Sequence, residues 1–302
     1  MIEKTRNGEV ELAYERIGPP EGTPLMLLMG SGCQMAMWPD DVLRLFVDHG
    51  FQVVRMDYRD TGLATHLHQY DDLPRKQRPG YTLDDVADDV IAVFDALGWP
   101  SAHVMGGSRG GMIAQLVAAR HPDRVRTVTM QGVAPSNSLR LIRPRLRTVI
   151  RVLGAAAGLS KTRDQEAEKW AKIIRATANP VLPADLEHWR EAGRISFDRG
   201  LNPKGEMRLT AALFKTGDRR PRLGKITSPA LVVHGKRDGM GHWKAGKATA
   251  DAIPGAKFVL YPEMGHVPTN AQWPALVAEI SELAARGDAG HRPRDADTPR
   301  RR

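Results

Sequence analysis

Apolar residues fall into two alternating kinds of segment along most of the chain. Short continuous apolar runs, bounded by Gly, Asp or Pro, are typical of central strands buried on both faces of a parallel sheet. They occupy residues 25–29, 51–56, 102–105, 125–130, 230–233 and 257–261. The segments between them repeat apolar residues every three or four positions, which predicts amphipathic helices. These occupy residues 39–49, 83–97, 112–119, 243–252 and 272–286. The alternation predicts an α/β fold with a mostly parallel sheet and right-handed crossovers.

Turn and capping signals indicate one further element and the start of one helix already named. Residues 2–17 are predicted to form a β-hairpin, because Asn7-Gly8 favours a tight turn and the residues after it alternate between apolar and polar. Thr82, followed three residues later by Asp85, predicts a capping box at the start of the helix over 83–97.

The alternation stops near Pro135 and resumes near residue 224. In between, the sequence has helical periodicity but no convincing strand, which predicts a helical lid over residues 135–222. The α/β core then consists of residues 1–134 and 223–286. Residues 287–302 are rich in Pro, Asp and Arg and nearly free of apolar side chains, so we expect a disordered tail.

The charge of the chain is concentrated in the predicted lid. The net charge is +9, but residues 134–222 carry 19 Lys and Arg against 9 Asp and Glu, and the rest carries 25 against 26. No aromatic residues are interleaved with these cations in the way that base stacking requires, so we expect no nucleic-acid partner.

One segment of the lid combines cations with apolar residues. Arginines at 140, 143, 145, 147 and 151 alternate with apolar residues over 141–153, which predicts an amphipathic basic helix. The favoured interpretation places its apolar face on the core and its arginines in water. A dimer contact or an anionic membrane surface is the alternative.

Other composition features limit the class of protein. The N-terminus lacks the apolar segment of a secretory signal, and the longest apolar runs are far shorter than the ~20 residues of a membrane span. A single cysteine, Cys33, excludes an internal disulfide and fits the cytoplasm. His66 and His68, followed by Asp71 and Asp72, are too few for a metal site, so we expect a polar loop and no metal.

The most informative stretch is Gly106-Gly107-Ser108-Arg109-Gly110-Gly111, which lies between a predicted strand and a predicted helix. G-x-S-x-G in a strand–turn–helix context predicts a nucleophile elbow with a strained serine at its apex. Strand and helix approach each other closely there, so the flanking positions need glycine, which lacks a Cβ. The helix also directs its first amides toward a developing oxyanion.

A serine hydroxyl needs a base, and the base needs a third group to orient it. Asp238 follows the strand at 230–233, and His266 follows the strand at 257–261, which gives the order Ser, Asp, His. We expect His266 to be the general base and then the general acid for Ser108, with Asp238 holding its tautomer.

Rival side chains fit these roles less well. Glu263 is only three residues before the histidine, within the same loop. His234 follows its strand too early to be the base, and His242 lacks a carboxylate on a neighbouring strand. His103 lies inside a predicted strand and is interpreted as a packed core residue.

The tetrahedral intermediate needs two amide donors. We expect them to be the backbone N–H groups of Arg109 and Ser31, the latter in the Gly30-Ser31-Gly32 loop after a buried strand. Gly30, Met35 and Trp38 are the predicted pocket residues of this region, although core packing explains Met35 and Met37 equally well.

These motifs resemble the α/β-hydrolase superfamily over about residues 9–286. The resemblance depends on Met29-Gly30-Ser31, on residues 57–62 and 106–111, and on the loops that hold Asp238 and Gly265-His266. Within the superfamily the chain is similar to lid-bearing carboxylesterases such as aclacinomycin methylesterase, which share Met-Gly before the oxyanion residue and a following Trp-Pro pair. Arg109 departs from that branch, which more often has an apolar residue there.

The resemblance implies an eight-stranded sheet, a helical lid, no cofactor and hydrolysis through an acyl-enzyme. We therefore predict a serine hydrolase that cleaves carboxylic esters or lactones of small hydrophobic molecules. An N-acyl-homoserine lactonase, a thioesterase and an iminopeptidase-like amidase are enzymatic alternatives with the same triad. A ligand-binding receptor that kept the fold is the non-enzymatic alternative.

Overall fold

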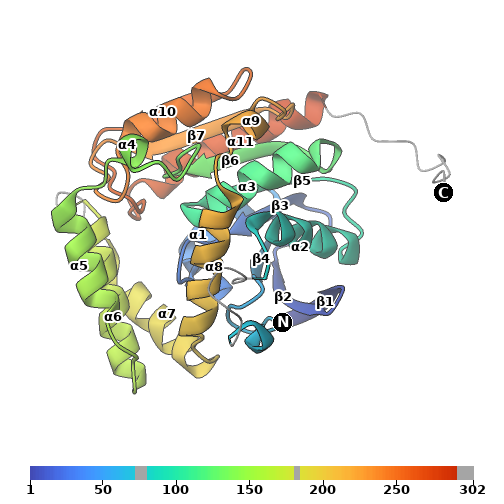
Figure 1. Ribbon diagram of the computed structural model, residues 1–302. Helices are drawn as coiled ribbons and strands as arrows, with labels where there is room; N and C mark the ends of the chain where they lie inside the picture. The colour runs from blue at the N-terminus through green and yellow to red at the C-terminus, as the bar shows by residue number, and fades with distance from the viewer. Residues whose placement is uncertain (72–79, 180–183, 291–302) are drawn as a thin grey trace.

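A single eight-stranded sheet forms the centre of the computed structural model, which describes residues 1–71, 80–179 and 184–290 (Figure 1). The strand order is β1-β2-β4-β3-β5-β6-β7-β8. The strands are β1 (Ile2–Asn7), β2 (Val10–Ile17), β3 (Thr23–Leu28), β4 (Phe51–Asp57), β5 (Ala102–Gly107), β6 (Val125–Gln131), β7 (Ala230–Gly235) and β8 (Lys257–Tyr261). β2 runs antiparallel to both β1 and β4, and every other pair is parallel. The predicted α/β sheet is therefore confirmed.

Helices cover both faces of the sheet and bury an apolar layer on each. The core helices are α1 (Asp40–Asp48), α2 (Leu83–Ala96), α3 (Arg109–Arg120), α10 (Trp243–Asp251) and α11 (Trp273–Gly290). Residues of α2, α3 and α10 pack in one hydrophobic cluster and those of α1 and α11 in the other. Thr82 and Asp85 form the predicted capping box at the start of α2. None of the described helices combines the length and apolar content that a membrane crossing requires.

The loop after β4 explains the motif at residues 57–62. The Asp57 carboxylate folds back to accept the backbone N–H groups of Met35 (2.7 Å) and Leu63 (3.0 Å). A Cβ on Gly62 would lie 2.2 Å from that carboxylate, so only glycine fits. Asp57 thereby connects this loop to the segment after β3, where the predicted oxyanion residue lies.

Among the described residues, six helices lie between β6 and β7, where the sequence predicts the lid. They are α4 (Leu139–Ile142), α5 (Leu146–Ala156), α6 (Arg163–Thr177), α7 (Leu186–Asp198), α8 (Pro203–Thr216) and α9 (Arg220–Leu223). In Figure 1, α5, α6 and α7 stand at one side of the sheet, and α8 crosses between them and the core. The stacked rings of Trp170 and Trp189, with centroids 6.1 Å apart, join α6 to α7.

Three expectations about this part of the chain and the C-terminus were wrong. The basic segment is not one helix, because Arg143 adopts a left-handed backbone conformation between α4 and α5. Nor does its apolar face lie on the core, since Leu146, Ile150 and Leu153 are exposed. Residues 287–290, which were expected to belong to a disordered tail, are part of helix α11. Helix α11 continues to Gly290 because Gly287 packs on Thr127 and Asp288 pairs with Arg126. Residues 291–302 lie outside the described residues.

Candidate active site

Ser108 sits at the apex of a tight turn between β5 and α3. Its φ of 53° and ψ of −120° are rare for a residue with a side chain, which confirms the predicted strain. A Cβ on Gly106 would lie 2.3 Å from the backbone of Gly110, and one on Gly110 would lie 2.1 Å from the carbonyl oxygen of Leu28. The glycines are therefore required by the close approach of strand and helix, as the sequence predicts.

The structure brings His266 and Asp238 together at the carboxyl ends of β8 and β7. The Nδ1 atom of His266 lies 2.8 Å from Oδ2 of Asp238. The other carboxylate oxygen accepts the backbone N–H groups of Met240 (2.7 Å) and Gly241 (3.0 Å). Asp238 is buried, so these contacts replace the water that its charge would otherwise require.

Electrostatics around this pair favour an ionised carboxylate and a more basic imidazole. Burial alone would raise the pKa of Asp238, but the charges and hydrogen bonds of His266 and His234 hold it well below its usual range. Burial alone would lower the pKa of His266, but the charge and hydrogen bond of Asp238 raise it. With Nδ1 directed at the carboxylate, Nε2 is the ring nitrogen left for proton transfer.

His234, which the sequence argument rejected as a base, is a second neighbour of the same carboxylate. Its Nε2 lies 3.1 Å from Oδ2 of Asp238 and 3.1 Å from the carbonyl oxygen of Gly241. The side chain is fully buried behind the carboxylate and makes no contact with the cavity described below. It therefore supports Asp238 as a second contact of the same carboxylate oxygen that His266 meets.

Gln131 is a residue that the sequence argument missed. Its backbone carbonyl accepts the N–H of Ser108 (2.8 Å), and its side-chain amide donates to the carbonyl of His266 (2.8 Å). The nucleophile turn and the histidine loop are thus joined through the end of β6. A polar residue directly after an apolar strand is the only signal in the sequence that could have indicated it.

The Gly30-Ser31-Gly32 loop lies against the nucleophile turn. A Cβ on Gly30 would approach the Cβ of Ser108 to 3.4 Å. The N–H of Gly32 donates to Oε2 of Glu206 on α8 (3.0 Å), and the same carboxylate receives two hydrogen bonds from the Arg109 guanidinium (2.6 and 2.8 Å). Arg109 is 1% exposed, so its side chain does not reach the substrate space but ties α8 to this loop.

A cavity of about 220 Å³ opens at Ser108 and His266. Its walls include two pairs of tryptophans, one pair from the core and one from the inserted helices. These are Trp38 with Trp273 and Trp170 with Trp189. Gly30, Ser31 and Trp38 line the cavity. Met35 does not, because its backbone is held by Asp57 and its side chain is fully buried in the core, so the pocket role predicted for it is corrected.

Other reactive groups near the site are held inactive or apart. Cys33 lines the cavity, but burial raises the pKa of its thiol to about 12, so it is a poor nucleophile at neutral pH. His66 contacts the carbonyl oxygen of Gly62 (3.0 Å), and Asp72 lies outside the described residues. Within the described ranges, no group of three or more His, Cys, Asp or Glu side chains is arranged to hold a metal ion.

Comparison with known proteins agrees with the fold. A family model described as alpha/beta hydrolase fold matches residues 23–269. Rhodomycin D methylesterase DauP of Streptomyces sp. strain C5 is 28% identical over 90% of this chain and 94% of its own length. The pimeloyl-[acyl-carrier protein] methyl ester esterase of Chromobacterium violaceum is 28% identical over 68% of this chain and 76% of its own. The crystal structure of an esterase, RhEst1, from Rhodococcus sp. ECU1013 matches with a TM-score of 0.70 at 22% identity, covering 94% of this chain and 98% of that one.

Proposed function

The chain belongs to the α/β-hydrolase fold family, and on that basis we propose that it is a serine hydrolase that cleaves carboxylic esters of small hydrophobic molecules through an acyl-enzyme on Ser108. The observation that supports this most directly is the His266–Asp238 hydrogen bond beside a cavity that Ser108 also lines. The names of two relatives, both esterases of methyl esters, favour a methyl ester as substrate.

Acylation begins when the Oγ of Ser108 attacks the ester carbonyl carbon and Nε2 of His266 takes the hydroxyl proton. The negative charge that develops on the carbonyl oxygen is stabilised by the backbone N–H groups of Ser31 and Arg109. Asp238 stabilises the imidazolium and keeps its ring in place. The intermediate then collapses, and the departing alcohol takes the proton from His266, which leaves an acyl group on Ser108.

Deacylation repeats these steps with water. Nε2 of His266 removes a proton from water as its oxygen attacks the acyl carbon, and the second tetrahedral intermediate releases the carboxylic acid. The proton returns from His266 to Ser108. The enzyme regains its starting state without a cofactor in any step.

The inserted helices act as a lid in this proposal. Residues 135–222 supply the tryptophan pair of α6 and α7 that closes the cavity opposite the sheet. An apolar cavity of this size takes up the acyl or alcohol part of a hydrophobic ester and excludes water from the reacting carbonyl.

The proposal is tested by Ser108→Ala. Because the nucleophile is lost while the fold has no reason to change, turnover of p-nitrophenyl butyrate should fall by at least ~10³-fold with an unchanged melting temperature. Ser281→Ala, at a half-buried position of α11 that does not line the cavity, is a matched control and should keep full activity. An active Ser108→Ala enzyme would show that another residue is the nucleophile.

Labelling separates the enzyme from a ligand-binding receptor with the same fold. A fluorophosphonate should modify wild-type protein at Ser108 and leave the alanine variant unmodified, since only an activated serine reacts. A panel of methyl esters, lactones, thioesters and proline amides then ranks the chemical classes of substrate by kcat/KM.

A further inference from the structure

Apolar side chains on the surface are concentrated in one short segment of the lid. Among the described residues eight large apolar side chains are exposed, and five of them lie between residues 139 and 159. Three form one side of α5: Leu146 (72% exposed), Ile150 (59%) and Leu153 (64%). No residue of α5 is buried. A contiguous exposed apolar ridge of this kind marks a surface that binds something.

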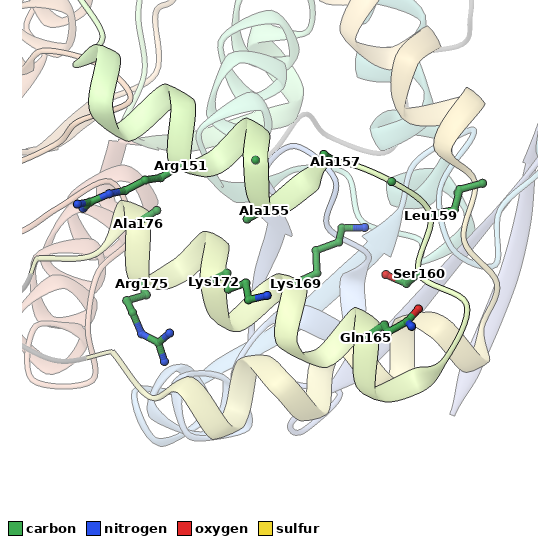
Figure 2. A pocket seen from close by; sticks show the side chains of 12 residues that line it. Arg151, Ala155, Ala157, Leu159, Ser160, Gln165, Lys169, Lys172, Arg175 and Ala176 are labelled. Atoms are coloured by element: carbon green, nitrogen blue, oxygen red, sulfur yellow. The ribbon is translucent and has the colours of Figure 1, made fainter.

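The segment that carries the ridge is cationic and contains no carboxylate of its own. Residues 139–161 contain six Lys and Arg and no Asp or Glu. In the part of the chain that the structure describes, none of the five arginines between 140 and 151 forms an ion pair with a carboxylate. An open groove of about 700 Å³ continues the cationic surface between α5 and α6. Figure 2 shows its basic residues: Arg151 on α5, and Lys169, Lys172 and Arg175 on α6, of which Lys169 pairs with Glu166 (2.9 Å).

We propose that this outer face of α5, defined by Leu146, Ile150 and Leu153 with the adjacent arginines, docks on an anionic phospholipid surface. An interfacial helix places apolar residues among the acyl chains while flanking cations contact anionic headgroups. Both parts of that pattern are present on one helix, 11 residues long, that the protein core does not cover.

Two other binding partners fit the chemistry of the α5 face less well. A second copy of the chain in a two-fold contact would bring the same carboxylate-free cationic segment against itself, which electrostatic repulsion opposes. A nucleic acid would match the cations but would leave the three large aliphatic side chains exposed to a polar backbone. The ridge also carries no aromatic residue on which bases could stack.

The inner side of the same helix connects the docking surface to the candidate active site. Val152 lines the cavity that contains Ser108. The start of α5 is also held by the loop of Asp238, because the N–H of Arg145 donates to the carbonyl of Gly239 (2.8 Å). If the proposed ester hydrolysis is correct, docking places the α5 wall of the cavity against the bilayer in which hydrophobic esters dissolve. The binding itself does not depend on catalysis.

Vesicle binding by the full chain tests the proposal. The Ser108→Ala protein is used so that no lipid is hydrolysed, and its cosedimentation is compared between phosphatidylcholine vesicles with and without phosphatidylglycerol. We expect binding only to the anionic vesicles, weakening as salt is raised. Arg147→Gln/Arg151→Gln should weaken it by about 25-fold, at about fivefold for each cation near the surface. Leu146→Ser/Ile150→Ser/Leu153→Ser should weaken it by at least ~10-fold.

Matched controls change the same chemistry elsewhere. Lys215→Gln/Lys225→Gln removes two exposed cations, and Met207→Ser/Phe214→Ser removes two exposed apolar side chains, both outside the α5 face. These should alter binding by less than ~2-fold, and circular dichroism should show that every variant is folded. Absent vesicle binding, or equal weakening by controls and α5 variants, overturns the proposal. The proposal is also overturned if the protein is a dimer that Leu146→Ser/Ile150→Ser/Leu153→Ser converts to a monomer while vesicle binding stays unchanged. Preferential binding of RNA over vesicles overturns it as well. Because all these measurements use inactive protein, they leave the ester-hydrolase proposal untouched.

Discussion

The two sides of the candidate ester cavity are built by opposite means. On the sheet side, backbones approach so closely that a single methyl group on Gly110 would collide with Leu28, and the buried Arg109 and Asp238 side chains are each held by hydrogen bonds. On the α5 side, a helix with no buried residue rests on the cavity through half-buried side chains such as Val152. The rigid side holds groups that must stay within tenths of an ångström, and the lightly packed side can open at little cost in free energy.

The arginines of the protein also fall into two groups, buried and exposed, that amino-acid composition alone cannot distinguish. Arg109 and Arg208 are buried and hold carboxylates on other elements, namely Glu206 and Asp60. The arginines of α5, in contrast, are exposed. Within the inserted segment, Arg208 therefore has a structural role, whereas the arginines of α5 lie on the surface. Only the second kind is available to a partner.

The largest effect on activity is expected from a substitution of Asp238, the buried charge on the sheet side of the cavity. Asp238→Asn keeps the size of the side chain but removes the charge that orients and stabilises His266, so kcat should fall by about 10⁴-fold. Steady-state kinetics on p-nitrophenyl butyrate measure the loss. A variant that retains more than a tenth of wild-type kcat would contradict the role of Asp238.

The pH profile separates this electrostatic role from simple damage. His266 must be neutral to act as base, and its pKa is raised, so kcat/KM of the wild type should rise with pH around a midpoint above about 6.5. In Asp238→Asn the midpoint should move down, because the carboxylate no longer opposes the effect of burial.

The free energy of unfolding should depend on pH in opposite directions through Asp238 and His266. The lowered pKa of Asp238 stabilises the fold above about pH 4 and is lost in acid, whereas the raised pKa of His266 stabilises it below about 6.5 and is lost as pH rises.

A smaller effect is expected where the sheet side meets the inserted helices, at the Arg109–Glu206 pair. Arg109→Met removes the two charged hydrogen bonds to Glu206, whose carboxylate is partly exposed and keeps the Gly32 amide, so the free energy of unfolding should fall by about 1.5 kcal/mol. The oxyanion loop also loses its fixed support, and kcat should fall by about 10-fold. Urea unfolding and steady-state kinetics measure the two effects.

The double variant Arg109→Met/Glu206→Met is the control for this pair. No charge remains unpaired in it, so it should unfold at higher urea than Arg109→Met alone. A double variant that is less stable than the single would show that packing of the long side chains matters more than their charges.

The parts of the site that could be predicted from the sequence are those set by local geometry. Gly106 and Gly110 are within four residues of each other, and the turn between them allows few other residues. The loops after β7 and β8 follow from strand order, because neighbouring parallel strands end at the same edge of the sheet.

Other features depend on packing between distant segments, which no local pattern encodes. Arg109 meets Glu206 across 97 positions of sequence, and Gln131 meets His266 across 135. The direction in which α5 presents its apolar residues was predicted wrongly for a related reason. An amphipathic pattern defines two faces of a helix but does not say which face the rest of the protein covers.

The smallest effects are expected on the lightly packed side, and they should differ between the two faces of α5. Val152→Ser puts a hydroxyl into the cavity wall and weakens apolar contact with the substrate. Because that contact is made equally in the ground state and the transition state, KM for p-nitrophenyl butyrate should rise by about 3- to 10-fold while kcat changes little. Ile150→Ser, two positions earlier on the exposed face, should leave KM unchanged and alter the free energy of unfolding by less than about 0.5 kcal/mol. The two substitutions lie on one helical turn and make comparable changes in polarity, so a difference between them reports the face alone. Equal effects on KM would mean that α5 moves as a unit during turnover and that both of its faces meet the substrate.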